Sequence, residues 1–319
     1  MSFNVIGTGS AYPVKVVTND DLAGIVDTSD EWIRTRTGVA ERRICTTETI
    51  TDLALEAAQK ALDNAKEYIE NIDLIICATI SGDYITPSMA CILQDKLGLS
   101  CPAFDVSAAC SGFIYALDIA ASYFARGTVR NILIVAADAL SKVVDWKDRS
   151  TCVLFGDGAA AAVLGKGEGL KAIKLSASGN IEALNLPNIR NVVPWVDKPA
   201  ENTYFAMNGH DVYKFAVSSM IHNVREVVKM ANLSNEEITY VLPHQANIRI
   251  IDAAKRRLDI PEDRYYTNIE KFGNMSCVCI PMMLDELNMS GKLRKGDKLV
   301  MSAFGGGLTT GACVLEWNG

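Results

Sequence analysis

Helical and strand-like hydrophobic patterns alternate along the first half of this chain. Residues 53–65 place apolar side chains at helical spacing, whereas residues 72–79 form a continuous apolar run of strand length. The same alternation predicts further helices at 87–97 and 113–124 and further strands at 3–7, 103–106, 131–137 and 158–164. Strands that alternate with helices are typical of an α/β fold built on a largely buried sheet.

Glycines and three prolines interrupt this pattern between residues 166 and 205. The same order of elements then returns, with helices expected at 210–230, 247–258 and 276–287 and strands at 238–242, 298–303 and 311–316. We interpret this return as an internal duplication that divides the chain into residues 1–170 and residues 171–319. In that register we expect Asn274 to be the counterpart of Cys110.

Composition places the chain among ordinary globular proteins with two lobes. It has 319 residues, of which 49% are hydrophobic and 22% charged. No basic, apolar leader opens the sequence, and no uncharged apolar run reaches the ~18–20 residues of a membrane span. Nine cysteines without CxxC spacing are typical of free thiols in a reducing compartment. We therefore expect a cytoplasmic protein without a membrane segment.

Several binding functions are disfavoured by the sequence. The net charge of −7 argues against general nucleic-acid binding, and an acidic partner would need a local basic patch. Residues 7–10 (GTGS) do not continue as a dinucleotide-binding loop, because Tyr12 replaces the third glycine and Pro13 ends any helix. Cys277 and Cys279 are close together, but with no histidine near them we expect core packing and no metal site.

Cys110 stands at the junction between the expected strand 103–106 and the expected helix 113–124. Unpaired amide hydrogens at a helix N-terminus favour a thiolate. A free cysteine titrates near ~8.5, and a partly buried helix N-terminus stabilises a negative charge by ~1–2 kcal/mol, or about one pKa unit. We therefore expect Cys110 to be substantially ionised at neutral pH and consider it a candidate nucleophile. A small buried thiol is the alternative.

Two more positions at strand ends carry candidate chemistry. His244 follows the strand 238–242, at the C-terminal end where loops of open α/β sheets gather ligands. Residues 305–307 (GGG) follow the strand 298–303 and lack the lysine and hydroxyl of a phosphate-binding loop. Glycines there let amide hydrogens approach a bound group closely, as an oxyanion hole requires, although a tight turn also explains them.

Trp32 lies in a polar region among Arg34, Arg36, Arg42 and Arg43. The indole is either a half-buried cap on the domain or a flat surface on which a base stacks, with arginines nearby for phosphates.

Four separated motifs together closely resemble the β-ketoacyl-[acyl-carrier-protein] synthase III family. They are residues 105–112 (DVSAACSG), 243–247 (PHQAN), 273–276 (GNMS) and 303–307 (AFGGG). The resemblance runs nearly end to end and includes residues 6–10 (IGTGS) and 27–33 (DTSDEWI). It implies a thiolase-like fold, in which two duplicated α/β halves pack in αβαβα layers, and a homodimer.

The resemblance also implies a reaction. An acyl-CoA primer would acylate Cys110, and malonyl-[acyl-carrier-protein] would then lose carbon dioxide to give an enolate that attacks the acyl-enzyme. This is a decarboxylative Claisen condensation that initiates type II fatty acid synthesis without a metal or redox cofactor. Cys110 would be the nucleophile, the amides of Cys110 and Gly306 would hold the oxyanion, and His244 and Asn274 would donate hydrogen bonds to the malonyl thioester carbonyl.

Further residues match family positions for the two substrates. Trp32 and Arg149 would enclose the adenine of CoA, Arg36 would meet a CoA phosphate, and Gly209 and Asn247 would lie along the pantetheine arm. A basic patch would receive the acidic carrier protein, and it comprises Lys214, Arg249, Lys255, Arg256 and Arg257. For Lys255 and Arg256 a solvated helix face is the alternative.

Departures from the family pattern concern the primer. Thr86 stands at a position that lines the acyl pocket across the dimer interface, where acetyl-selective members resemble one another in carrying phenylalanine. The smaller residue predicts tolerance of longer or branched primers. Cys277, Cys279 and Phe272 also depart from the usual residues, and the sequence offers no functional account of them.

Three other functions remain open from the sequence. A thiolase is disfavoured because that family carries a second catalytic cysteine where this chain has Ala303 and Phe304. A starter-unit condensing enzyme or acyltransferase of specialised metabolism would use the same catalytic residues. A non-catalytic carrier-binding protein would have no reason to keep all of them.

Overall fold

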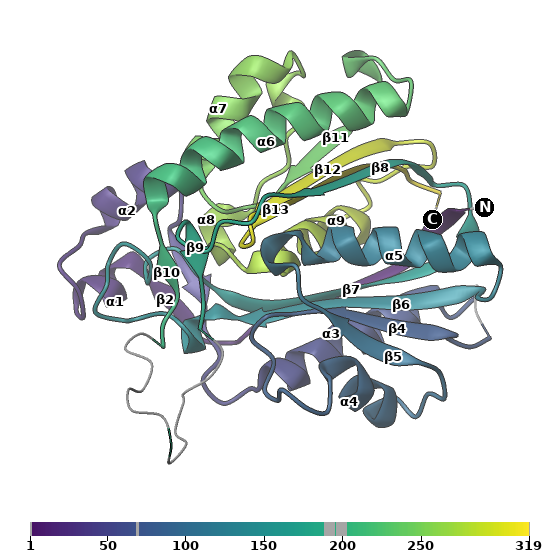
Figure 1. Ribbon diagram of the computed structural model, residues 1–319, viewed down its shortest axis with the longest axis horizontal. Helices are drawn as coiled ribbons and strands as arrows, with labels where there is room; N and C mark the ends of the chain where they lie inside the picture. Colours follow the sequence, from purple (N-terminus) through teal and green to yellow (C-terminus); the bar gives the residue numbers. More distant parts are fainter. Residues whose placement is uncertain (1, 68–69, 188–194, 196–202, 319) are drawn as a thin grey trace.

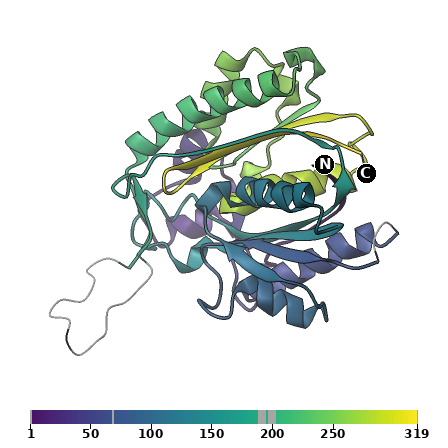
Figure 2. The ribbon, with the colours of Figure 1, turned by 45° about the vertical axis from the view of Figure 1, so that its right-hand side comes forward.

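Five layers of secondary structure, in the order helix, sheet, helix, sheet, helix, make up the computed structural model (Figure 1). The structure describes residues 2–67, 70–187, 195 and 203–318. Figures 1 and 2 both show helices α5 (Gly112–Arg126) and α9 (Cys279–Met289) between the two sheets. The layered α/β arrangement expected from the sequence is therefore confirmed.

The first sheet comes from the N-terminal part of the chain and has the strand order β1-β7-β6-β4-β5. Its outer face is covered by α3 (Ile50–Ala65) and α4 (Met89–Lys96), whose alanines and leucines pack in one buried cluster with the strands. The strands are β1 (Ser2–Ala11), β7 (Asp157–Gly167), β6 (Asn131–Ala139), β4 (Leu74–Ala78) and β5 (Ala103–Val106).

The second sheet repeats this order with later strands, β8-β13-β12-β11. Its outer face is covered by α6 (Gly209–Met230) and α7 (Ile248–Leu258). The first sheet has a fifth strand, β5, at its edge. At the corresponding edge of the second sheet, next to β11, the described residues form only an isolated parallel bridge between Val241 and Tyr265. The strands are β8 (Leu170–Ala177), β13 (Thr309–Glu316), β12 (Lys298–Gly305) and β11 (Tyr240–Pro243).

Short elements surround one end of the layers. The helices there are α1 (Asn19–Ala23), α2 (Asp30–Thr37) and α8 (Ile269–Phe272), and the strand pairs are β2 (Val16–Thr18) with β3 (Glu41–Arg43) and β9 (Leu184–Asn185) with β10 (Ala206–Met207). The single-turn helices, at this end and elsewhere, are η1 (Ala109–Ser111), η2 (Leu140–Lys142), η3 (Asn235–Glu237), η4 (Glu262–Arg264) and η5 (Ser276–Val278). Among the described helices, none is long and apolar enough to cross a bilayer.

The helices and strands expected from the sequence are all present, with shifted ends. One strand of the two main sheets was missed, as were the short elements α1, α2, α8, β2, β3, β9 and β10. β8 lies inside the region 166–205, where the pattern was expected to break. Most of its residues are half-buried or exposed, so it lacks the continuous apolar run by which the other central strands were found. β1 also continues through residues 7–10 to Ala11, so the glycines of that motif lie within a strand and not in a loop.

The expected pairing of Asn274 with Cys110 in the duplicated halves is wrong. Ala109, with φ 45°, opens η1 directly before α5, and Ser276, with φ 55°, opens η5 directly before α9. The second residue of η1 is Cys110 and the second residue of η5 is Cys277. The expected first helix began after its single turn, whereas the expected second helix, 276–287, included its turn, so the predicted register was three residues off. Cys277 is therefore the structural counterpart of Cys110.

Candidate active site

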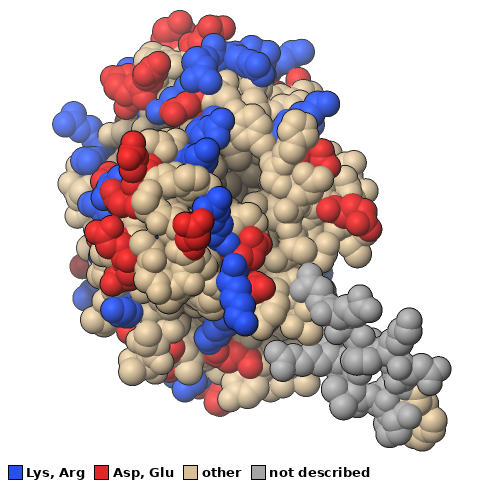
Figure 3. Space-filling view, turned by 90° about the vertical axis from the view of Figure 1, so that its left-hand side faces the viewer, with Lys and Arg blue, Asp and Glu red and all other residues tan. Residues whose placement is uncertain are grey.

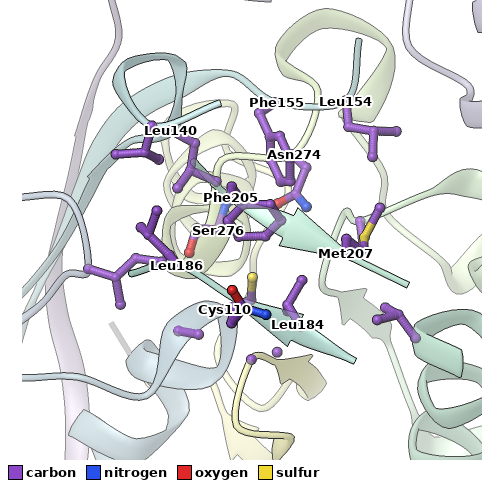
Figure 4. Close-up of a pocket in the computed structure, with 18 of the residues that line it drawn as sticks. Cys110, Leu140, Leu154, Phe155, Leu184, Leu186, Phe205, Met207, Asn274 and Ser276 are labelled. Atoms are coloured by element: carbon purple, nitrogen blue, oxygen red, sulfur yellow. The ribbon is translucent and has the colours of Figure 1, made fainter. Parts of the chain in front are cut away.

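A cavity of about 1140 Å³ lies where the two sheets and the short elements meet. Figure 4 shows Cys110 and Asn274 among the side chains that line it, with apolar side chains such as Leu140 and Phe205 around them. The cavity is lined by nine residues singled out from the sequence: Trp32, Arg36, Cys110, Gly209, His244, Asn247, Arg249, Asn274 and Gly306. Residues from both halves of the chain therefore face one space.

Cys110 is held in a tight turn against the end of β12. A Cβ atom on Gly305 would lie 2.6 Å from the Cys110 amide nitrogen, so no side chain fits at position 305. The Thr309 hydroxyl lies 2.8 Å from Ser111 Oγ, 3.1 Å from the carbonyl oxygen of Ala108 and 3.0 Å from that of Gly306. This hydroxyl ties the glycine turn to the cysteine turn.

The expected ionisation of Cys110 is wrong for the unliganded site. Burial raises the pKa of the thiol to about 12, although the nearby Ser276 side chain opposes the rise. The helix N-terminus contributes about one pKa unit, which is smaller than the cost of burying a thiolate. Cys110 is therefore a neutral thiol at neutral pH before a substrate binds.

His244 directly follows β11 and is buried. Its backbone N–H donates to the carbonyl oxygen of Ser302 at 2.8 Å, and its ring meets the Phe304 ring edge-on with centroids 5.2 Å apart. Burial lowers the pKa of the imidazole to about 3, so the ring is neutral at pH 7. Neither ring nitrogen has a hydrogen-bond partner among the described residues, so one N–H is available to a substrate.

Asn274 is oriented by both its backbone and its side chain. Its amide N–H donates to the Leu154 carbonyl at 2.9 Å, and its carbonyl accepts from the Gly156 N–H at 3.1 Å. Oδ1 accepts from the Ser276 amide at 2.8 Å, which leaves the Nδ2 amide as the group offered to the cavity. A fixed amide donor therefore lies in the same cavity as the His244 ring and the Cys110 thiol.

Gln245 links the positions of His244 and Asn274, a role that sequence reasoning did not assign. Its Nε2 donates to the Pro243 carbonyl at 2.6 Å, and its Oε1 accepts from the backbone of Asn268 and Ile269 at 3.3 and 3.2 Å. The first contact holds the end of β11 and the others hold the start of α8. A glutamine directly after a candidate histidine was the only available signal.

Trp32 at the mouth of the cavity has two arginines beside its ring. The Arg36 guanidinium lies 4.7 Å and that of Arg149 5.0 Å from the ring centroid. Arg149 does not line the cavity, and its Nη1 donates to the Asp27 carbonyl at 2.5 Å. A planar group that stacked on the same face as either guanidinium would displace it.

Gly209 and Asn247 line the cavity at the starts of two helices. Gly209 is the first residue of α6, and a Cβ on it would meet nothing within 4 Å. Asn247 caps α7, and its Oδ1 accepts from the Arg249 amide at 2.9 Å. Gly209 therefore adds no side-chain bulk to the cavity, and the Asn247 side chain is held at the start of α7 by its capping contact.

Thr86 lies outside the cavity of a single chain. Its neighbour Ile85 does line the cavity and is 81% exposed, and Tyr84 is 63% exposed. The segment 84–86 thus presents apolar surface to solvent in the isolated chain.

The basic residues of the expected patch are divided between two places. Arg249 lines the main cavity, whereas Lys214 and Arg257 line a second groove of about 940 Å³ between α6 and α7. Arg256 is exposed and lines neither of these two hollows, and the Lys255 ammonium lies 5.1 Å from the Tyr265 ring centroid. Figure 3 shows Lys and Arg side chains beside a hollow on the face that carries α2, with acidic side chains also nearby.

The core packing expected for Cys277 and Cys279 is confirmed, since both are buried in the cluster between the sheets. Cys277 Sγ donates to the Ala78 carbonyl and to Asp138 Oδ2, each at 3.3 Å. No group of three or more His, Cys, Asp or Glu side chains is arranged to hold a metal ion in the described part of the chain.

Two family models match the chain. Residues 104–179 match 3-oxoacyl-[acyl-carrier-protein] synthase III, and residues 228–317 match the C-terminal domain of the same enzyme. The first match contains Cys110, and the second contains His244, Asn274 and Gly306.

Relatives with the same name match over almost the whole chain. The beta-ketoacyl-[acyl-carrier-protein] synthase III of Clostridium acetobutylicum is 45% identical over 99% of both chains, and that of Oceanobacillus iheyensis is 47% identical over 100% of both. The crystal structure of the Aquifex aeolicus 3-oxoacyl-[acyl-carrier-protein] synthase III superposes with a TM-score of 0.92 at 46% identity, covering 99% of this chain and 100% of that one. A priming beta-ketosynthase of a polyketide pathway has the same TM-score at 34% identity over 99% of this chain and 96% of that one.

Proposed function

The chain belongs to the 3-oxoacyl-[acyl-carrier-protein] synthase III family, and we propose how its residues divide the condensation reaction of that family. It is a thiolase-like condensing acyltransferase that initiates fatty acid synthesis. The observation that carries the proposal is that Cys110, His244 and Asn274 come from three separate elements and line one cavity.

In the first half-reaction, Cys110 attacks the thioester carbonyl of an acyl-CoA primer and CoA leaves as the thiol. The amides of Cys110 and Gly306 hold the negative oxygen of the tetrahedral intermediate. The contacts of Thr309 with both turns support this pairing, because they fix the glycine turn against the cysteine turn. The Cys110 proton leaves during attack and is taken up by the departing sulfur of CoA, so that CoA leaves as the thiol.

In the second half-reaction, malonyl-[acyl-carrier-protein] enters and His244 and Asn274 donate hydrogen bonds to its thioester carbonyl. Loss of carbon dioxide then leaves an enolate whose negative oxygen these donors stabilise. Its carbon attacks the acyl group on Cys110, the bond from that group to Cys110 Sγ breaks, and the released thiolate takes a proton from solvent. The products are β-ketoacyl-[acyl-carrier-protein], CoA and CO₂, and the scheme requires no cofactor. The free Nδ2 of Asn274 and the unpaired ring nitrogens of His244 support these donor roles.

The mouth of the cavity is proposed to bind CoA. Trp32 and Arg149 enclose the adenine, Arg36 meets a phosphate, and Gly209 and Asn247 lie along the pantetheine arm. The stacked arginines support this assignment, since adenine can replace a guanidinium on the Trp32 ring without loss of a planar contact.

A homodimer is proposed to complete the acyl pocket. β5 is an open edge of the first sheet, and the exposed Tyr84 and Ile85 beside Thr86 offer apolar surface for a second copy to bury. Thr86 would then reach the partner's pocket. With threonine in place of a bulky ring, turnover with isobutyryl-CoA and butyryl-CoA should at least match that with acetyl-CoA; a manyfold preference for acetyl-CoA would contradict this role.

The acidic carrier protein is proposed to dock on Lys214, Arg249, Arg256 and Arg257. Arg249 at the cavity and the groove between α6 and α7 support a path from this surface to the site. Arg249→Glu should weaken use of malonyl-[acyl-carrier-protein] far more than acylation by acyl-CoA. Equal losses in both steps would reject the docking role.

The halves 1–170 and 171–319 are proposed as two duplicated domains, which the matching strand orders of the two sheets support. The proposed compartment is the cytoplasm. All nine cysteines are free, as is typical of a reducing environment.

Two half-reactions measured separately test the proposed mechanism. With labelled acyl-CoA alone, label should stay on the wild-type protein and on His244→Ala and Asn274→Ala. Both variants should then fail to form β-ketoacyl product when malonyl-[acyl-carrier-protein] is added. Normal condensation by either variant would remove that residue from the decarboxylation step.

A starter-unit condensing enzyme of specialised metabolism is the second candidate, favoured by the likeness to the priming beta-ketosynthase. A panel of acyl-CoA primers and carrier proteins separates the two. Preference for a carrier protein of specialised metabolism over that of fatty acid synthesis would favour this second candidate.

A further inference from the structure

Arg42, on β3, is a charged side chain at 0% exposure. Burial lowers the pKa of its guanidinium to about 10, so the group is still charged at neutral pH. No ion pair of Arg42 is found among the residues that the structure describes. A buried charge is costly, and it is stabilised here by hydrogen bonds from the two terminal nitrogens and by the nearby carboxylates of Asp21 and Asp30, whereas Nε has no hydrogen-bond partner among the described residues.

Three neutral oxygen atoms accept hydrogen bonds from this guanidinium. Nη1 donates to the Val17 carbonyl at 3.2 Å and to Asn19 Oδ1 at 2.8 Å, and Nη2 donates to the Val153 carbonyl at 2.9 Å. Val17 and Asn19 belong to β2 and α1, whereas Val153 begins the segment 153–156, of which residues 153–155 line the cavity. Arg42 thus joins the surface elements to a wall of the active site.

The stem of Arg42 packs where the segments 153–156 and 272–274 cross. A Cβ on Gly156 would lie 3.3 Å from the Arg42 Cβ, and a Cβ on Gly273 would lie 3.7 Å from it. At the same crossing, Leu154 accepts the Asn274 amide and Gly156 donates to the Asn274 carbonyl. Arg42 therefore contacts both segments that fix the backbone of Asn274.

We propose that Arg42 is a positioning residue for the Asn274 amide, and through it for the decarboxylation half-reaction. By holding the Val153 carbonyl, the guanidinium sets the place of Leu154 and Gly156, which bond the Asn274 backbone on both sides. The acylation half-reaction uses Cys110 and Gly306, whose turns are tied by Thr309 without contact to Arg42. The inference rests on the role assigned to Asn274 under the proposed function.

Arg42→Lys tests the proposal in the full-length protein. Lysine keeps the positive charge but lacks the planar fork that reaches three acceptors at once. Acylation of Cys110 by labelled acyl-CoA should stay within about twofold of wild type, whereas condensation of that acyl group with malonyl-[acyl-carrier-protein] should slow by about 10- to 100-fold. An unchanged condensation rate, or equal losses in both steps, overturns the proposal.

Asp285→Asn is the matched control for general loss of buried hydrogen bonds. Asp285 is buried on α9 and accepts from Thr8 Oγ1 at 2.7 Å and from Ser10 Oγ at 2.5 Å, in contacts that do not involve Arg42 or Asn274. This variant should lower thermal stability without changing the ratio of the two half-reaction rates. A selective loss of condensation in the control would show that the effect is general and would overturn the proposal.

Asn19→Ala is the second variant if Arg42→Lys does not fold. It removes one acceptor and leaves the guanidinium bonded to Val153, so the expected loss is smaller and confined to condensation. If Asn19→Ala shows no selective loss of condensation, the proposal is overturned. Asn274→Ala distinguishes the role of Asn274 in decarboxylation from the role of Arg42 in positioning it. If it spares condensation, the role of Asn274 is wrong and the Arg42 inference falls with it. If Asn274→Ala selectively loses condensation while Arg42→Lys does not, only the inference about Arg42 fails.

Discussion

Cys110 and Cys277 occupy equivalent places in the two halves of the molecule but have opposite surroundings. Each is the second residue of a single-turn helix that opens on a residue with positive φ and runs directly into a helix between the sheets. Cys110 lines the cavity, whereas Cys277 is buried and donates to Ala78 and Asp138. The same backbone arrangement therefore places one thiol at the cavity and the other in the core.

The difference comes from the strand end that each thiol faces. Beside Cys110, β12 ends in a glycine turn that fills little space. Beside Cys277, the last residues of β6 include the buried Asp138, whose Oδ1 accepts from Ile80 N–H and Ser81 Oγ, each at 2.8 Å. Around Cys277, hydrogen-bonded side chains therefore occupy the space that is open as a cavity beside Cys110. The two thiols therefore differ in the space left around the sulfur and not in the turn that carries it.

The largest expected effect separates the two thiols directly. Cys110→Ala should abolish retention of acyl label, because no other nucleophile replaces the sulfur. Cys277→Ala should keep the label and lower the free energy of unfolding by about 1–2 kcal/mol, through loss of packing and of weak hydrogen bonds. Label counting on intact protein and denaturant melts measure both. Label on Cys110→Ala, or its loss in Cys277→Ala, would break the comparison.

The second effect concerns the pH at which Cys110 reacts in the unliganded enzyme. Since burial raises the pKa of this thiol to about 12, its thiolate fraction should rise about tenfold per pH unit between pH 7 and 9. Alkylation by iodoacetamide, followed on the Cys110 peptide by mass spectrometry, should climb without levelling. A free cysteine, with a pKa near ~8.5, levels off above pH 9 and is the control. A plateau for Cys110 below pH 8 would restore the helix-terminus prediction.

The smallest expected effect is the contribution of the neutral His244 imidazole, directly after β11, to the pH dependence of stability. Its folded pKa of about 3 lies below the ordinary value of 6.5, so the unfolded chain takes up the proton first as pH falls. The contribution of His244 to stability is therefore complete above pH 6.5 and declines between pH 6.5 and 3, by up to about 1.4 kcal/mol per pH unit.

His244→Gln lacks this titration, so the stability difference between wild type and variant should shift steadily toward the variant from pH 6.5 to 4.5. Denaturant melts at a series of pH values measure it. Parallel stability curves over that range would mean that the imidazole is not buried in neutral form.

The fold was largely predictable because its central strands are continuous apolar runs and its covering helices have regular apolar spacing. β8 escaped because it is half exposed, and its neighbouring glycines indicated a break in the pattern. The 3₁₀ turns before α5 and α9 escaped as well, and with them the register that pairs Cys110 with Cys277. Turns of three residues leave no periodic signal in a sequence.

For the candidate site, the sequence predicted which residues meet but not how their surroundings change them. Cys110, His244 and Asn274 each follow or precede a recognisable element, so their convergence could be expected from topology. The pKa of Cys110 depends on how many atoms surround the sulfur, which no local pattern records. Arg42 looked like one of several surface arginines, and only the packed structure reveals that it is buried at the crossing beside Asn274.

The close contact between Gly305 and the Cys110 amide has a consequence for mutational tolerance. A Cβ at position 305 would overlap backbone atoms, which cannot move aside as a flexible side chain does. In a saturation library selected for growth on the enzyme's activity, every substitution at this codon should be depleted to the level of a stop codon. At Gly209, by contrast, a Cβ meets nothing within 4 Å, so alanine should survive that selection.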